Sequence, residues 1–146
     1  METEERVSAA NHVVAVAVVL IDHGRLLALR RSAHREAGAG LWEAFSGRVD
    51  PGEEPLAAAY REALEETGIE VEIDPRPVTS YAATRAGVPM IVIVYRAVAK
   101  SVSAKVILSD EHDAFAWLTP DEFAERSQIG PLVQAVRTAF DISETT

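Results

Sequence analysis

The sequence predicts an α/β or α+β sandwich in which helices pack on a mixed sheet. Segments with strand composition occur before, between and after segments with helical patterning, which is typical of a layered fold. The chain has 146 residues, of which 48% are hydrophobic and 25% charged, as expected for one globular domain. No repeat or linker divides it, so we expect residues 1–146 to form a single domain.

Seven segments have strand character, because they are rich in Val, Ile or aromatic residues or are bounded by turn residues. We expect strands over residues 13–21, 25–30, 42–45, 71–73, 78–83, 88–99 and 114–118. The first is the longest apolar run. A membrane span needs about 20 residues, so this shorter run indicates a buried strand. Residues 32–41 are expected to form a surface loop.

The segment from Pro55 to Thr67 has the clearest helical pattern. Pro55 suits the first helical turn, and Gly68 suits the end because glycine adopts the left-handed conformation. The apolar stripe expected to pack on the core comprises Leu56, Tyr60, Ala63 and Thr67. We also predict a helix start capped by Thr119 and a final helix over residues 131–141.

Charge and cysteine content exclude several functions. The chain has 14 Lys and Arg against 23 Asp and Glu, so the net charge is 14 − 23 = −9 with His neutral. A binder of polymeric nucleic acid needs a basic face instead. The absence of Cys excludes disulfides, a thiolate zinc site and a thiol nucleophile. The acidic N-terminal segment lacks the pattern of a secretory signal. We therefore expect a cytoplasmic protein without a membrane partner.

Three carboxylates, Glu62, Glu65 and Glu66, have i, i+3, i+4 spacing on the predicted helix. This spacing puts them on one face, nearly opposite the apolar stripe, where like charges repel. A divalent cation would turn this repulsion into coordination, and carboxylate oxygens suit hard ions such as Mg²⁺. The alternative is a solvated acidic face that Arg61 partly neutralises.

The trio belongs to a longer ordered series. Gly47 is followed after five residues by Glu53, and after seven more by Arg61-Glu62 and the residues through Ile69. This series resembles the Nudix box, G-x5-E-x7-R-E-U-x-E-E-x-G-U, where U is a bulky apolar residue. The resemblance covers residues 47–69 and implies the family's α/β/α sandwich around a mixed sheet.

Two positions depart from the family pattern. Ala63 stands where a larger aliphatic residue is usual, so we expect a repacked core. Ser46 stands where a second Gly is usual. Because Ser tolerates a positive φ poorly, this change puts the loop backbone in doubt.

The resemblance implies a set of site residues. Glu62, Glu65 and Glu66 would bind Mg²⁺, with Mn²⁺ as a substitute, and Ser46 would add its backbone carbonyl. Glu53 and Arg61 would pair to brace the site. The alternatives for Glu53 are a metal contact or a plain acidic residue beside a turn. The predicted catalytic residues are Glu53, Arg61, Glu62, Glu65 and Glu111.

Glu111 lies outside the box, on an acidic segment before the strand at 114–118. Family members often place an extra metal ligand or general base on this loop, and Asp110 and Asp113 compete with Glu111 for that role. A solvated acidic loop is the alternative. We expect His112 to be a polar loop residue, because no second His lies at metal-ligand spacing.

The substrate would need cationic and aromatic partners. Arg side chains clamp phosphates in bidentate fashion. The candidates are Arg30, Arg31 and Arg48, with Arg35 in a nearby loop; solubilising roles are the alternative. Trp42, Phe45, Tyr81 and Trp117 would stack a base or pack in the core.

The predicted function is Mg²⁺-dependent hydrolysis of a phosphoanhydride bond by metal-activated water. The substrate would be a nucleoside diphosphate linked to another moiety, such as a nucleoside triphosphate or an ADP-ribose-like compound. The alternative is a non-catalytic nucleotide sensor with the same fold. Isopentenyl-diphosphate isomerase is disfavoured, because that family relies on a cysteine. The sequence selects neither the substrate nor the oligomeric state, for which a homodimer is one option.

Overall fold

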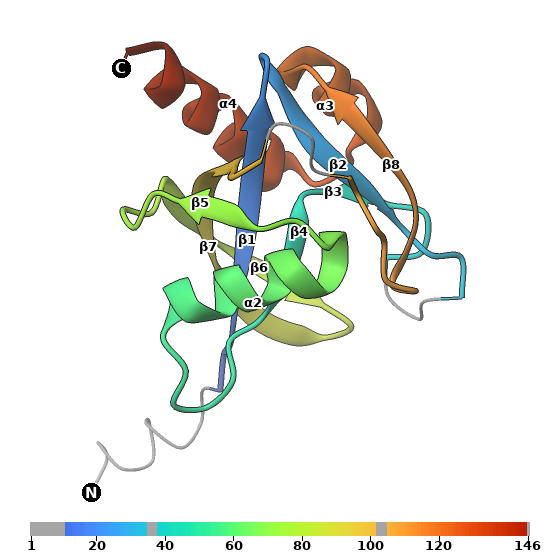
Figure 1. The fold of residues 1–146 in the computed structure, drawn as a ribbon. Coiled ribbons are helices and arrows are strands. Elements are labelled where there is room, and N and C mark those ends of the chain that lie inside the picture. Colours follow the sequence, from blue (N-terminus) through green and yellow to red (C-terminus); the bar gives the residue numbers. More distant parts are fainter. Residues whose placement is uncertain (1–10, 35–37, 102–104, 146) are drawn as a thin grey trace, which may run out of the picture.

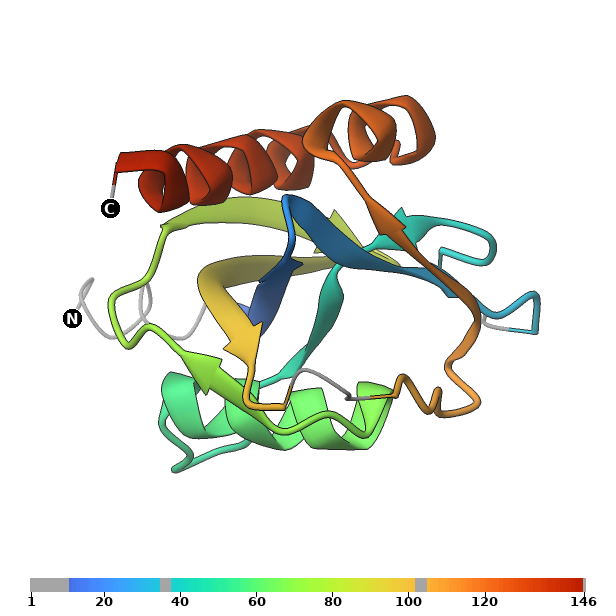
Figure 2. The same ribbon diagram turned by 45° about the horizontal axis from the view of Figure 1, so that its top comes forward.

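The helices of this protein lie on two opposite faces of a mixed sheet (Figure 1). The computed structural model describes residues 11–34, 38–101 and 105–145. Figure 2 shows α3 (Pro120–Arg126) and α4 (Gly130–Thr145) on one side of the strands and α2 (Pro55–Thr67) on the other. The predicted sandwich is confirmed. Within the described ranges, no helix has the length and hydropathy that a membrane span needs.

The sheet is mixed and centres on its first strand. In chain order, the strands are β1 (Val13–Asp22), β2 (Arg25–Arg31), β3 (Trp42–Glu43), β4 (Phe45–Arg48), β5 (Val71–Ile73), β6 (Thr79–Arg85), β7 (Val88–Ala99) and β8 (His112–Leu118). β1 is parallel to β7 and antiparallel to β4, while β5 and β6 pair antiparallel with β7. β2 pairs antiparallel with β1, β3 and β8.

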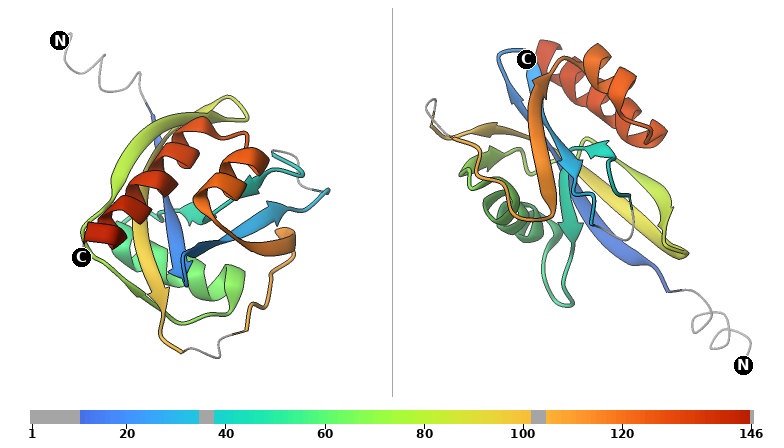
Figure 3. Two further views of the ribbon diagram at one scale, coloured as in Figure 1. Left: turned by 90° about the horizontal axis from the view of Figure 1, so that it is seen from above. Right: turned by 90° about the vertical axis from the view of Figure 1, so that its right-hand side faces the viewer.

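β1 is buried on both faces because a helical layer covers each of them. Its alternate side chains point to opposite sides, as in any strand. Val16, Val18 and Leu20 join the core under α2, which also holds Ala58, Ala59 and Ala63 of that helix. Ala15, Ala17 and Val19 join the core under α3 and α4, with Phe123, Leu132 and Val136. Figure 3 shows these layers from two further directions.

The orientation of α2 differs from the sequence-based expectation. Tyr60 and Leu64 are 37% and 58% exposed, although Tyr60 belongs to the predicted apolar stripe. The face that packs on the sheet carries small residues, Ala58, Ala59 and Ala63, and the carboxylates Glu62 and Glu66. The predicted stripe was therefore wrong in part. Small side chains let the helix lie close to β1 and β4, which turns two glutamates inward.

Several predicted ends of helices and strands agree with the structure, and others are shifted by a few residues. Gly68 caps α2 with a φ of 70°, and Thr119 with Glu122 forms a capping box at α3. The segment 42–45 is two short strands, β3 and β4, because the chain leaves β2 after Glu43 and pairs next with β1. β8 starts at His112, two residues earlier than predicted. Ser46 lies in β4 opposite Ala17, and its φ is not positive.

Candidate active site

Strand β4 brings the first box residue directly against helix α2. Gly47 faces the carboxylate of Glu62, and a Cβ atom at position 47 would overlap the Glu62 side chain. Because the backbone φ here is not positive, a tight turn does not explain this glycine. Glycine is needed because a carboxylate occupies the space of a side chain.

The three helix carboxylates do not share one environment. Glu62 and Glu66 are buried on the face toward the sheet, whereas the Glu65 side chain is 57% exposed. The spacing had suggested that the acidic face lies opposite the packing face, and this expectation was wrong. Glu62 and Glu66 belong to the packing face, and only Glu65 is exposed.

Glu66 has the least compensated carboxylate of the site. Its side chain is 2% exposed. Among the described residues, neither of its oxygens has a hydrogen-bond partner. Burial and the nearby carboxylate of Glu62 raise the pKa of Glu66 far above its usual range. Buried polar atoms are almost always paired, so this pair of oxygens marks a position where a ligand is expected.

Glu111 and His112 lie beside Glu66. One ligand atom from each of these three residues falls within 4.8 Å of the others. The two carboxylates suit a hard divalent cation, and an imidazole nitrogen lies beside their oxygens. The structure thus brings Glu111 to the box helix, although it lies far from residues 47–69 in the sequence. Asp113 instead accepts a 2.7 Å hydrogen bond from Arg30, and Asp110 is exposed.

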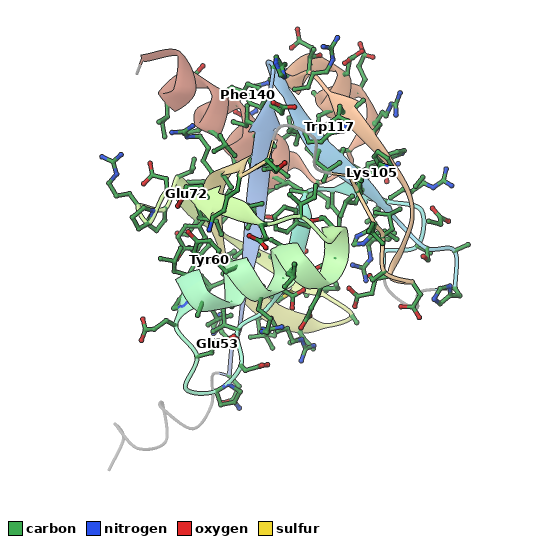
Figure 4. All side chains as sticks on the ribbon, viewed as in Figure 1. Glu53, Tyr60, Glu72, Lys105, Trp117 and Phe140 are labelled. Carbon is green, nitrogen blue, oxygen red and sulfur yellow. The ribbon has the colours of Figure 1, made fainter. Side chains whose placement is uncertain are left out.

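Arg61 connects the acidic residues around the helix start. Its guanidinium donates to both oxygens of Glu53 at 2.9 Å and to Glu62 at 2.8 Å. The same group donates to the backbone carbonyl of Arg48 at 3.0 Å and to Glu65 at 3.4 Å. The pair between Glu53 and Arg61 is therefore present. Hydrogen bonds from Arg61 and from the backbone of Asp50 lower the pKa of Glu53 to about 2. Figure 4 labels Glu53 in the loop before α2.

His112 is a buried residue at the start of β8, which corrects its expected place in a polar loop. Arg30 pairs with Ala114, but Arg31 pairs with His112, so Asp113 forms a β-bulge. A regular register would put Asp113 opposite Arg31. The bulge puts the imidazole there instead, and its side chain is 1% exposed. No pattern in the sequence indicates this bulge.

Glu43 is a site residue that the sequence reasoning missed. Its buried carboxylate contacts His112 Nε2 at 2.9 Å and Arg31 Nη1 at 3.2 Å. Arg85 Nη2 lies 3.6 Å from its other oxygen. Burial opposes ionisation of Glu43, but the hydrogen bond to His112 and the charges of both arginines outweigh it, so its pKa lies below its usual value. The only sequence signal was a charged residue inside a predicted strand.

The predicted phosphate-binding arginines have different environments. The side chain of Arg31 is only 6% exposed, in its ion pair with Glu43, yet it lines a polar cleft of the protein. Arg48 lines the same cleft and is exposed. Arg30 pairs with Asp113 and lies over the ring of Trp42. Arg35 lies outside the described residues.

Two adjoining clefts open beside the carboxylates. A polar cleft of about 630 Å³ is lined by Glu62, Glu111 and several arginines, including Arg48, Arg61 and Arg85. An apolar cleft of about 490 Å³ extends toward α4, and Ala15, Ser46, Arg85, Ala86 and Met90 line both. The site can therefore hold a ligand with a charged and an apolar part.

Of the four candidate stacking residues, Tyr81 lines the apolar cleft. Phe45 is fully buried under α2, and Trp117, labelled in Figure 4, packs against the same core. Trp42 packs against the core under α3 and α4, with the guanidinium of Arg126 5.2 Å from its ring centre. Core packing thus accounts for three of these aromatic residues, whereas Tyr81 both packs against the core under α3 and α4 and lines the cleft.

Comparisons with known proteins agree with this geometry. The family model for the NUDIX domain matches residues 11–136. A MutT-like protein of Streptomyces ambofaciens is 39% identical over 126 residues, which cover 86% of this chain and 75% of that protein. The asymmetrical bis(5'-nucleosyl)-tetraphosphatase of Rattus norvegicus is 39% identical over 96 residues, 62% of this chain and 64% of that protein.

A solved structure with the same architecture is the Caenorhabditis elegans Ap4A hydrolase binary complex. It superposes with a TM-score of 0.81 at 23% identity, covering 92% of this chain and 99% of that one, which shows the shared fold. The chain belongs to the Nudix hydrolase family, whose members act on phosphoanhydride bonds.

Proposed function

We propose that this chain is a Mg²⁺-dependent hydrolase that cleaves a phosphoanhydride bond in a nucleoside diphosphate linked to another moiety. The observation that carries the proposal is the buried Glu66 carboxylate, which lacks a hydrogen-bond partner among the described residues and lies beside Glu62, Glu111 and the polar cleft. We further propose that residues 1–146 act as one domain in the cytoplasm.

The residues present fit a divalent cation. Glu62, Glu65 and Glu66 would supply carboxylate oxygens, and Ser46 its backbone carbonyl. When bound, the cation would neutralise phosphate charge and lower the pKa of a water molecule. Arg61 holds Glu53 and Glu62 in fixed positions through charge-assisted hydrogen bonds, so both act as a preformed part of the site.

Glu111 is the proposed proton acceptor for the attacking water. It lines the polar cleft from the segment before β8, whereas Glu62 and Glu66 belong to α2. A carboxylate from outside the helix can receive a proton from the water while the helix carboxylates keep their positions around the cation. Glu111 could instead join the ligand set, because its carboxylate also lies near Glu66.

The two clefts support the proposed substrate class. Arg48 and Arg85 give the polar cleft positive charge for phosphates, and Tyr81 and Leu132 give the neighbouring cleft apolar surface for a base. The name of the Rattus norvegicus relative supports dinucleoside tetraphosphates among the candidates. Nucleoside triphosphates and ADP-ribose-like compounds have the same combination of charged and apolar parts.

A nucleotide panel tests the proposal. The purified chain would be incubated with a dinucleoside tetraphosphate, an oxidised nucleoside triphosphate, ADP-ribose and a nucleotide sugar, with Mg²⁺ or with a chelator. We expect cleavage of at least one compound that requires the cation and falls at least about 10²-fold in Glu66→Gln. Glu72→Gln removes an exposed carboxylate from β5 (Figure 4) and should retain full activity. Tight binding without cleavage of any compound would favour the sensor alternative.

A further inference from the structure

A buried polar chain connects strand β3 to the metal-binding face of helix α2. His112 lies between two carboxylates: its Nε2 is 2.9 Å from Glu43 Oε2, and its Nδ1 is 3.5 Å from Glu66 Oε1. The side chains of these three residues are 1–3% exposed. Water therefore does not compete for these contacts.

We propose that His112, held by Glu43, is a positioning residue that orients the Glu66 carboxylate for a divalent cation. This inference rests on the proposed function and adds two residues outside the box to its machinery. Residues that fix the orientation of a metal ligand contribute to metal affinity without touching the metal.

Glu43 can hold His112 because Glu43 is itself fixed. Its Oε2 also accepts a hydrogen bond from Arg31 at 3.2 Å, and Arg85 lies 3.6 Å from its Oε1. A carboxylate that faces two guanidinium groups stays ionised and accepts the Nε2 hydrogen of the imidazole. This acceptor fixes the ring plane, so Nδ1 faces Glu66, and a ring with a proton on each nitrogen donates to both carboxylates.

The contact on the other side of the ring is incomplete in the structure. Among the described residues, His112 Nδ1 and both Glu66 oxygens lack hydrogen-bond partners, although Nδ1 and Oε1 face each other. A shift of a few tenths of an ångström would bring 3.5 Å within the range of a hydrogen bond. Contact at Oε1 leaves Oε2 for another ligand.

The β-bulge at Asp113 is the backbone feature that makes this arrangement possible. Without it, Asp113 would occupy the position opposite Arg31 and place a third carboxylate near Glu43 and Glu66. The bulge instead sends Asp113 outward to Arg30 and brings an imidazole between the two buried carboxylates. The irregular register between β2 and β8 therefore helps to form the site.

Two substitutions separate the contacts of the ring. In His112→Asn, the amide nitrogen takes the place of Nδ1 and keeps a donor toward Glu66. In His112→Gln, the amide nitrogen takes the place of Nε2 and keeps only the contact with Glu43. Thr67→Val is the matched control, because Thr67 is fully buried next to Glu66 and, among the described residues, its hydroxyl hydrogen-bonds only to the backbone of Ala63 and Ile69.

The experiment is a calorimetric titration of Mn²⁺ into each variant without substrate, together with its melting temperature. We expect His112→Gln to weaken Mn²⁺ binding by about 10–100-fold, His112→Asn to recover part of that loss, and Thr67→Val to lower the melting temperature with unchanged affinity. If His112→Gln does not fold, a weaker affinity in His112→Asn than in Thr67→Val supports the proposal.

Wild-type Mn²⁺ affinity in the folded His112 variants would overturn the proposal, as would an equal loss of affinity in Thr67→Val. The proposed function is tested separately, because it fails if the wild-type chain cleaves no nucleotide with bound metal. That failure would leave the comparison of Mn²⁺ affinities intact. For a substrate that is cleaved, a positioning role predicts a lower kcat with little change in KM.

Discussion

Replacing Gly47 with Ala is expected to displace the Glu62 carboxylate from the site. The added Cβ would overlap the Glu62 carboxyl group and lie 2.5 Å from its Cγ, whereas real Cβ contacts essentially never fall below 3.0 Å. The end of the glutamate must therefore move. The strand backbone at Gly47 accepts alanine without strain, because its φ is not positive.

The magnitude follows from two opposing effects. Overpacking a filled site costs about 1–3 kcal/mol, and replacing glycine in a compatible backbone recovers about 0.4–1 kcal/mol. We expect a net loss of about 1–2 kcal/mol in the free energy of unfolding if Glu62 stays buried, and less if it swings into the cleft. In either case a proposed ligand is misplaced, so Mn²⁺ affinity should fall at least about tenfold.

The assay combines chemical denaturation, Mn²⁺ titration and turnover. Gly130→Ala is the matched control, because no atom lies within 4 Å of its added Cβ and its φ is not positive. In a Glu62→Ala background the clash is absent, so Gly47→Ala should no longer destabilise the protein. Wild-type metal affinity and turnover in Gly47→Ala would refute the steric explanation of this glycine.

Three further predictions follow from individual contacts. Glu111→Gln should lower kcat with little effect on KM, while Asp113→Asn should keep activity; the opposite pattern in steady-state kinetics would show that Asp113 is the functional carboxylate. Arg31→Ala should lower the free energy of unfolding by about 3–5 kcal/mol, because it leaves the buried charge of Glu43 without its closest guanidinium; an unchanged denaturation midpoint with a raised KM would restore a role in phosphate binding alone. The pKa of Glu53 falls from 4.5 to about 2 on folding, so its contribution to stability is present above pH 4.5 and is lost as the pH falls toward 2. Glu53→Gln should therefore weaken the pH dependence of the melting temperature in this window, and an unchanged dependence would contradict the assigned pKa.

The sequence by itself determined the layered fold and the family. Apolar strands and one strongly patterned helix are local properties, set by side-chain periodicity and by residues such as Pro55 and Gly68 that suit a helix start and end. The spacing from Gly47 to Ile69 led to the Nudix family, which the family model confirms. The prediction of Glu111 rested on family resemblance, and the structure places its carboxylate near Glu66.

Only the tertiary structure decided which side chains face one another. Helical spacing groups Glu62, Glu65 and Glu66, but packing against β4 buries two of them and exposes the third. The contacts of Glu43 and His112 depend on a β-bulge and on strands far apart in the sequence. Register and close packing are relations between distant segments, so no local pattern in the sequence contains them.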